Sequence, residues 1–320
     1  MKMNYYMGID IGGTKSAYGL FDEEMQLIYK ETLPSDETLS GEEFFGRAEE
    51  QIRRFAARAD SLGGTFCGVG IGVPGFVDFD RGKVGRIPSL PKLDGFAVAD
   101  FLRGRLGGAF PILVDNDGHC GALAEYRQGA GRGKRNMLYC PVSTGISTGM
   151  ILDGKLFRGS NGASGESGHM LAAVSGKERL SCMCGNSGCF NSLCSGKAIV
   201  SHVRRWLDAG EKSILPELAG GTDRITARQI NEACEKGDAL AIRAVDQMAH
   251  YMAMWIFNVY MLLNVDCIVF SGGLLAMGEK LFGKMREEFE SYHTNGFPVE
   301  FKFTELGEDS GLIGAACLLC

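Results

Sequence analysis

The sequence predicts an α/β fold divided into two lobes. Strand patterns alternate with helical patterns along the chain, which is typical of sheets covered by helices. A unit of strand, Gly/Thr turn, strand, Asp turn and strand occurs near residue 10 and again near residue 140. With 320 residues, the chain is long enough to bury two hydrophobic cores. We therefore expect two α/β lobes whose central strands are mostly parallel.

Strand and helix patterns account for the first half of the chain. Residues 5–10, 16–21 and 26–33 are short runs of β-forming residues separated by turns, so we expect three consecutive strands. Residues 42–59 place apolar side chains on one helical face, and residues 66–73 form the continuous apolar run of a buried parallel strand. A helix, a strand and a helix follow at residues 98–106, 112–114 and 118–126.

The second half repeats this opening before it becomes mainly helical. Strands are expected at residues 137–142 and 146–152, with a third starting at residue 156. A long helix and a buried strand come next, and a short helix ends the chain. These last elements are expected at residues 239–263, 265–270 and 311–319.

The overall composition excludes several classes of protein. A formal charge of −6 and a pI near 5.5 argue against a nucleic-acid-binding surface, which needs clustered basic residues. The most apolar helix candidate, residues 248–264, is interrupted by His250, Asn258 and two tyrosines, so no membrane span is expected. Residues 1–10 lack the apolar core of a signal peptide. Eleven cysteines would risk mispairing in an oxidising compartment, and we therefore expect a cytoplasmic location.

Three cysteines and a histidine form the most specific motif in the chain. Cys182, Cys184 and Cys189 stand in a C-x-C-G-x-x-G-C pattern, and His169 precedes them. The two glycines of the pattern let the backbone fold sharply enough for the thiolates to converge on one ion. Cys3His is a closed tetrahedral set, typical of structural zinc, and it leaves no position open for catalysis. Zinc would hold still the loop that contains Glu166; the alternative is a group of unligated thiols.

Glycine turns at strand ends indicate phosphate binding. The turn at residues 10–15 is not a P-loop, but its N–H groups, hydroxyl and carboxylate suit phosphate and a hydrated Mg²⁺. Residues 143–145 form the matching turn, and residues 271–273 form a third. Each turn alone is more often an ordinary hairpin, whereas the three together favour a nucleotide. The residues expected to bind this cofactor are Asp10, Gly12, Gly13, Thr14, Lys15, Thr144, Gly145, Gly272 and Gly273.

Five motifs together resemble the ROK family of sugar kinases and sugar-responsive repressors. They are DIGGTK from residue 10, GVPG at 72–75, NDG at 116–118 followed by ALAE, GESGH at 165–169 and the cysteine pattern, and they span essentially the whole chain. The resemblance implies a two-lobed, ribonuclease H-like fold of the actin-like ATPase type, in which ATP and a hexose meet in a central cleft. It also implies a homodimer. The smaller lobe would comprise residues 1–117 plus 308–320, and the larger lobe residues 118–307 with the zinc loop.

The same resemblance assigns roles to individual residues. It implies that Asp117 is the general base that accepts the proton of the attacking hydroxyl. An ordinary ionised aspartate suffices, because a loose phosphoryl-transfer transition state needs only late deprotonation. The alternative role for Asp117 is that of a helix N-cap, a duty that Asn116 or Asp115 could share. The sugar contacts implied by the resemblance are Gly75, Asn116, Asp117, Glu166, His169 and Asn191.

Several positions depart from the family's pattern. Asn191 stands where the family usually has a glutamate, which contacts the anomeric hydroxyl in glucokinase-like members. An amide there favours sugars substituted at C1, such as β-glucosides, or another hexose or N-acetylhexosamine. Ser143 and Ser147 replace common glycines in the second phosphate turn, and Ser89 replaces a common asparagine.

Three functions therefore compete. The first is an ATP-dependent hexose kinase that phosphorylates the 6-hydroxyl. The second is a sugar-responsive repressor, which needs a helix-turn-helix ahead of the kinase-like part, and the motif at residue 10 leaves no room for one. The third is a catalytically silent sugar sensor, and the presence of Asp10, Thr14, Asn116 and Asp117 argues against it. The sequence favours the kinase.

Overall fold

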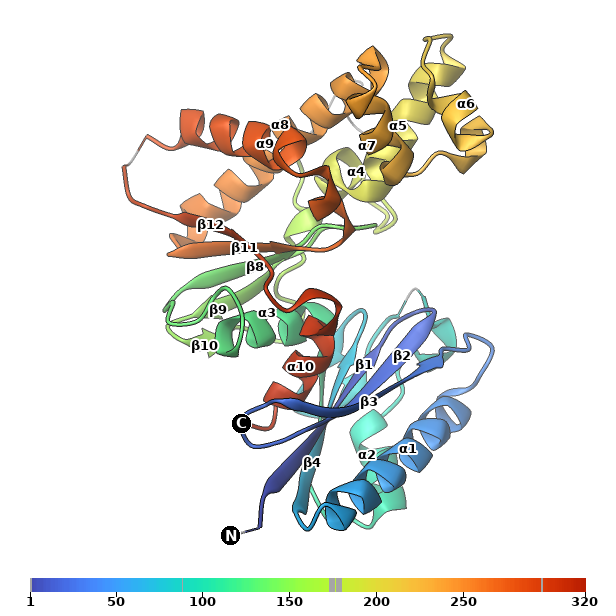
Figure 1. Cartoon of the computed structure of the whole chain (residues 1–320), viewed down its shortest axis with the longest axis vertical. Helices are drawn as coiled ribbons and strands as arrows, with labels where there is room; N and C mark the ends of the chain where they lie inside the picture. Colours follow the sequence, from blue (N-terminus) through green and yellow to red (C-terminus); the bar gives the residue numbers. More distant parts are fainter. Residues whose placement is uncertain (1, 88, 173–175, 177–179, 295) are drawn as a thin grey trace. The chain divides into compact units, whose positions relative to one another are not determined.

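The computed structural model describes residues 2–87, 89–172, 176, 180–294 and 296–320. Its contacts divide the chain into two units (Figure 1). Unit 1 comprises Met1–Tyr139, Gly149–Gly165 and Thr304–Cys320, and unit 2 comprises Cys140–Thr148 and Glu166–Phe303. The lobe boundaries expected from the sequence, at residues 117 and 308, remain a prediction.

A five-stranded sheet forms the centre of unit 1. Its order is β3-β2-β1-β4-β7. The strands are β1 (Asn4–Ile11), β2 (Lys15–Phe21), β3 (Leu27–Pro34), β4 (Thr65–Val73) and β7 (Ile112–Asn116). β2 is antiparallel to both of its neighbours, whereas β1, β4 and β7 run parallel. All five strands confirm the sequence predictions, and β7 continues two residues beyond its predicted end.

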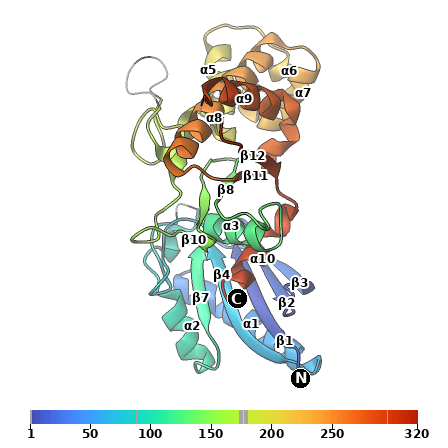
Figure 2. The same cartoon turned by 90° about the vertical axis from the view of Figure 1, so that its left-hand side faces the viewer.

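Helices cover both faces of this sheet. α1 (Gly41–Ser61) and α2 (Val98–Leu106) join the strands in the main hydrophobic core of unit 1. α3 (Asp117–Arg127) and α10 (Ser310–Cys317) form a smaller core around Phe21 of β2. Successive side chains of a strand point to opposite faces, so one sheet serves both cores. The two views in Figures 1 and 2 show α1 and α10 on opposite sides of the strands.

Glycines allow α10 to touch the backbone of its neighbours. A Cβ atom on Gly70 of β4 would lie 1.7 Å from the carbonyl oxygen of Ala315, and one on Gly8 of β1 would lie 2.3 Å from another α10 carbonyl. A Cβ on Gly314 would lie 1.8 Å from the carbonyl oxygen of Cys120 in α3. No other residue type fits at these separations. The helix is therefore held between the sheet and α3 by backbone contact.

A second five-stranded sheet has the order β10-β9-β8-β11-β12. Its strands are β8 (Met137–Pro141), β9 (Gly149–Leu152), β10 (Lys155–Leu156), β11 (Cys267–Ser271) and β12 (Glu300–Phe303). β8, β9 and β10 pair antiparallel, and β11 and β12 pair parallel. The repeat predicted near residues 10 and 140 is confirmed, because the strands of the two sheets match place by place. β9 begins three residues later than the predicted strand at 146–152, and β12 has no counterpart among the predictions.

Helices make up most of unit 2. They are α4 (Asn191–Cys194), α5 (Gly196–Asp208), α6 (Leu215–Ala219), α7 (Ala227–Glu235), α8 (Ala239–Leu263) and α9 (Glu279–Tyr292). α8 has its predicted bounds, with Asp238 as N-cap and Asn264 in the left-handed conformation at its end. Among the helices that the structure describes, none combines the length and apolar character needed to cross a lipid bilayer.

The contact between α10 and the sheet yields the first testable prediction. Replacing Gly70 by alanine should lower the free energy of unfolding by about 1–3 kcal/mol or more, because the new methyl group overlaps a backbone carbonyl. Gly104 in α2 is the control, since a Cβ there meets no atom within 4 Å. Gly104→Ala should stabilise the protein by about 0.5–1 kcal/mol. Urea denaturation measures both changes, and equal stability of the two variants would contradict the packing described for α10.

Candidate functional site

The turn after β1 is tight and carries a buried carboxylate. The N–H of Gly12 donates to the carbonyl oxygen of Lys15 at 2.9 Å, which closes the turn. Asp10 lies just before it, and burial raises the pKa of its carboxyl above the ordinary value, although nearby Lys15 acts in the opposite direction. Gly311 lets α10 begin beside this carboxylate, since a Cβ there would lie 2.8 Å from Oδ2 of Asp10. A divalent cation close to Asp10 would favour its charged form.

At the junction of β7 and α3, Asn116 is the helix N-cap. Its Oδ1 accepts hydrogen bonds from the N–H groups of Gly118 at 2.8 Å and His119 at 3.2 Å. Its Nδ2 donates to the carbonyl oxygen of Gly75 at 2.7 Å, so both ends of the amide are used inside unit 1. Gly75 has a φ of +85°, a conformation that favours glycine. This geometry decides between the alternatives that the sequence leaves open, because Asn116 does the capping.

Asp117 is consequently the first residue of α3 and not its cap. Its side chain is exposed, and its Oδ1 accepts the N–H of Gly118 at 2.8 Å. The N-terminus of a helix favours a negative charge. An exposed carboxylate that is held in one place by a backbone donor can orient a hydroxyl group and receive its proton.

In unit 2, two glycine turns meet at the ends of β8 and β11. The N–H of Val142 donates to the carbonyl oxygen of Ser271 at 2.8 Å, and Leu274 donates back to Val142 at 3.2 Å. A Cβ on Gly272 would lie 2.5 Å from the carbonyl oxygen of Val142, so only glycine permits this approach. A Cβ on Gly273 would lie 3.8 Å from the hydroxyl of Ser143. The structure thus brings together the turns at 143–145 and 271–273.

These two turns border a cavity of about 470 Å³. Its residues come from the turns, from α5, and from the segment that leads into α7. They are Ser143, Thr144, Gly196, Lys197, Val200, Ser201, Arg204, Ile225, Thr226, Ala227, Arg228, Gly273 and Leu274. Most of them are absent from the sequence prediction. One signal for this cavity is present in the sequence, because Ser195 is a favoured N-cap residue and indicates that a helix begins at Gly196. As the N-cap of α5, it places Gly196 and Lys197 at the cavity.

The predicted metal ligands converge. The ligand atoms of His169, Cys182, Cys184 and Cys189 all lie within 4.8 Å of one another. Cys182 Sγ is 3.4 Å from Nδ1 of His169, and Cys184 Sγ is 3.7 Å from Cys189 Sγ. In tetrahedral zinc sites the Zn–S bonds are about 2.3 Å long and the Zn–N bonds about 2.0–2.1 Å. Such a site places a ligand sulfur about 3.6 Å from a ligand nitrogen and about 3.8 Å from another ligand sulfur. The four residues therefore fit a zinc ion.

The surroundings of this cluster are ordered by hydrogen bonds. Nε2 of His169 points away from the cluster toward Glu166, whose Oε2 is 3.7 Å distant. Ser167, between these two residues in sequence, accepts hydrogen bonds from Trp255 of α8 and from Thr148, both at 3.0 Å. Glu166 and His169 thus lie side by side on a segment that is attached to the longest helix of unit 2.

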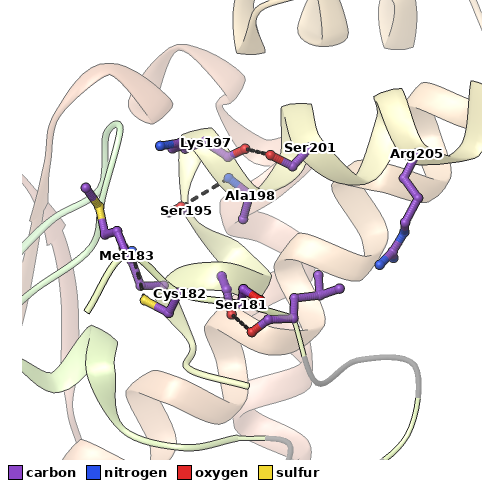
Figure 3. A pocket seen from close by; sticks show the side chains of 11 residues that line it. Ser181, Cys182, Met183, Ser195, Lys197, Ala198, Ser201 and Arg205 are labelled. Carbon is purple, nitrogen blue, oxygen red and sulfur yellow. Dashed lines mark hydrogen bonds between the residues drawn. The ribbon is translucent and has the colours of Figure 1, made fainter. Parts of the chain in front are cut away.

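Asn191 connects the cluster to the second glycine turn. Its Oδ1 accepts the N–H of Ile146 at 3.0 Å, and its Nδ2 lies 3.9 Å from Cys182 Sγ. A glutamate would lack the donor that faces the thiolate. Beside Asn191 and Cys182, a cavity of about 300 Å³ opens between the cysteine loop and the face of α5 that carries Lys197 and Arg205 (Figure 3).

Each unit therefore carries part of the predicted set. Unit 1 holds the residues of the first turn and those around the β7–α3 junction, and unit 2 holds the metal cluster and the other two turns. The members in unit 1 are Asp10, Gly12, Gly13, Thr14, Lys15, Gly75, Asn116 and Asp117. The members in unit 2 are Thr144, Gly145, Glu166, His169, Cys182, Cys184, Cys189, Asn191, Gly272 and Gly273.

Two sheets of matching order, with glycine turns after β1, β8 and β11, define an α/β protein of the actin-like ATPase class. The expected fold class is thereby confirmed. The model of the ROK family matches residues 6–320, and the chain belongs to this family.

Several glucokinases and hexokinases are similar to this chain over nearly their whole length. A ROK family glucokinase from Streptomyces griseus, solved in complex with glucose and AMPPNP, is 29% identical, with a TM-score of 0.77 and 98% of each chain covered. A ROK hexokinase from Thermus thermophilus is 30% identical, with a TM-score of 0.81 and coverage of 98% of this chain and 97% of that one. A glucokinase of Halalkalibacterium halodurans is 28% identical over 100% of this chain and 96% of its own.

The geometry of the cluster predicts a bound metal. We expect about one zinc ion per chain in the purified protein, and Cys189→Ser should lose most of it and unfold at a lower temperature. Cys234→Ser is the control, because that thiol of α7 is half-buried and lies outside the cluster. Elemental analysis and thermal unfolding with and without a chelator measure the effect. A fully folded protein that contains no metal would contradict the prediction.

Proposed function

We propose that the protein is an ATP-dependent hexose kinase of the glucokinase type, which transfers the γ-phosphate of ATP to the 6-hydroxyl of a sugar. The observation that carries this proposal is that two adjacent residues at the β7–α3 junction have different roles. Asn116 caps the helix, and the carboxylate of Asp117 stays exposed. The full-length similarity to glucokinases, at 28% and 29% identity, supports the same conclusion.

Asp117 is the proposed general base. In the reaction, the 6-oxygen of the sugar forms a bond to the γ-phosphorus while the bond from that phosphorus to the β,γ-bridging oxygen breaks. The hydroxyl proton passes to the Asp117 carboxylate, and ADP leaves. Because the transition state is loose, the main contribution of Asp117 is to align the hydroxyl, and deprotonation comes late.

The glycine turns are the proposed nucleotide sites. Backbone N–H groups of tight turns can bind phosphate oxygens, and Thr14 and Thr144 add hydroxyl donors. The cavity that Thr144 and Gly273 line in unit 2 supports this assignment. Bound Mg²⁺ would neutralise phosphate charge, with Asp10 holding it through water. The full proposed set is Asp10, Gly12, Gly13, Thr14, Lys15, Thr144, Gly145, Gly272 and Gly273.

Residues near the metal cluster and the β7–α3 junction are the proposed sugar contacts: Gly75, Asn116, Asp117, Glu166, His169 and Asn191. With Nδ1 of His169 on the metal, its Nε2 is left for a hydroxyl group. Glu166 lies beside that nitrogen and would accept from the sugar. Because position 191 carries an amide, the alternatives to free glucose as substrate are a C1-substituted sugar, another hexose and an N-acetylhexosamine.

Three further features belong to the proposal. The Cys3His cluster would hold zinc in a purely structural role, because all four positions are taken by protein ligands. The protein would act as a homodimer. A cytoplasmic location suits its eleven cysteines, all of which are free thiols in the structure.

A carboxylate-to-amide change tests the base. Asp117→Asn should lower kcat by about 100-fold or more while sugar still binds, because the amide keeps the shape of the side chain but accepts no proton. A coupled assay of ADP release measures turnover, and calorimetry measures sugar binding. Asp60→Asn, at an exposed position near the end of α1, is the matched control. Turnover near that of the wild type in Asp117→Asn would refute the assignment.

A second experiment concerns the sugar. The same assay with glucose, β-glucosides and N-acetylhexosamines identifies the substrate. Asn191→Glu should raise kcat/KM for free glucose relative to a β-glucoside by about tenfold, since a carboxylate accepts a hydrogen bond from a free anomeric hydroxyl. Asn191→Gln keeps the amide and is the control. If no sugar releases ADP, the silent sensor becomes the better description.

A further inference from the structure

Asp115 is a buried carboxylate at the end of β7, directly before the proposed sugar-binding residues. It is 1% exposed. Its Oδ1 accepts the N–H of Asn116 at 2.8 Å and Nδ1 of His119 at 2.8 Å, and its Oδ2 accepts Nε of Arg158 at 2.7 Å. Burying a carboxylate is costly unless it is paired with a cation and hydrogen-bonded. Here both conditions hold, and the cation comes from a distant part of the sequence.

His119 extends this network toward the same distant segment. This residue is 1% exposed, and its Nε2 lies 3.1 Å from the hydroxyl of Ser164. The Ser164 hydroxyl in turn donates to the carbonyl oxygen of Phe157 at 2.6 Å. One imidazole therefore bridges Asp115 at the end of β7 and the segment of residues 157–164.

Two more contacts hold that segment against the β5–β6 hairpin, within unit 1. The guanidinium of Arg158 lies 3.7 Å from the ring centre of Phe79, in the hairpin that β5 (Val77–Asp78) forms with β6 (Lys83–Val84). A Cβ on Gly162 would lie 1.9 Å from the carbonyl oxygen of Val77, so the backbones of segment and hairpin touch.

We propose that Asp115, His119 and Arg158 are positioning residues for the sugar side of the reaction, a role that rests on the proposed function. None of them contacts a reacting atom. Asp115 bonds to the backbone of Asn116, and through His119 and Arg158 it holds the segment of residues 157–164 at the end of β7. The network thus sets one proposed sugar contact, Asn116, from one buried anion, because the side chain of Asn116 also accepts a hydrogen bond from the N–H of His119. A displacement of about 1 Å at such a site costs on the order of 100-fold in rate.

The bond between His119 and Ser164 allows a selective test. An asparagine at position 119 can still donate to Asp115, because its amide nitrogen corresponds to Nδ1, but it is too short to reach Ser164. His119→Asn and Ser164→Ala therefore remove the same link and leave the Asp115 pairing intact. Each should lower kcat/KM for the sugar by about tenfold while the KM for ATP changes by less than about twofold. Their combination should lower kcat/KM no further than either alone.

Two more variants serve as a comparison and as a control for this test. His119→Ala removes both hydrogen bonds of the ring and should be worse than His119→Asn, so the amide partly rescues activity. Ser160→Ala is the matched control, because Ser160 is an exposed serine of the same segment. Circular dichroism and thermal unfolding establish that each variant is folded.

The outcomes separate the inference from the proposed function. A wild-type protein that phosphorylates no sugar defeats the proposed function, whatever the variants do. With an active wild type, unchanged sugar kinetics in Ser164→Ala would overturn the positioning role. So would additive losses in the double variant, or an equal rise in the KM values for sugar and ATP, because either result describes a general loosening of unit 1.

Discussion

The backbone contact between α10 and the sheet is the constraint on which unit 1 depends. The carbonyl groups of this helix lie against Gly70 and Gly8, and its own Gly314 lies against α3. The first turn of α10 also borders Asp10 through Gly311. One short helix thus fixes the distance between a buried carboxylate at the end of β1 and the helix whose first residue is Asp117. Small shifts of α10 would move both groups together.

Both units place their polar side chains where strands end. In unit 1, β1 ends at the turn after Asp10, and β7 ends at Asn116. In unit 2, β8 and β11 end at glycine turns that border one cavity. In open α/β sheets, ligands bind at the carboxyl ends of the strands because loops there are free to vary while the strands stay rigid. The proposed chemistry therefore sits on the least deformable parts of each unit.

The sequence predicted the strands of the first sheet, the long helix α8 and the convergence of His169 with three cysteines because each of these is a local signal. Apolar runs mark strands, and the spacing of Cys182, Cys184 and Cys189 is visible in a few residues. The cap at the β7–α3 junction was not decidable, because adjacent Asn and Asp residues are equally good caps. The hydrogen bonds that Oδ1 of Asn116 accepts from Gly118 and His119 separate their roles.

Other features depend on pairings that no local pattern contains. Arg158 lies 43 positions after its partner Asp115 in the sequence, and nothing around either residue identifies the other. The cavity beside Thr144 is assembled from α5, from the segment that leads into α7 and from two turns that lie far apart in the sequence. Tertiary contacts decide such elements more than their propensities do.

The four proposed metal ligands all fall within residues 169–189, long before β11 and β12 occur in the chain. A ring closed over so few residues has a low entropic cost and forms quickly. During synthesis on the ribosome, an ion could therefore bind this segment while β11 and β12 have yet to be translated. The metal would then order the loop that contains Glu166 before the second sheet is complete.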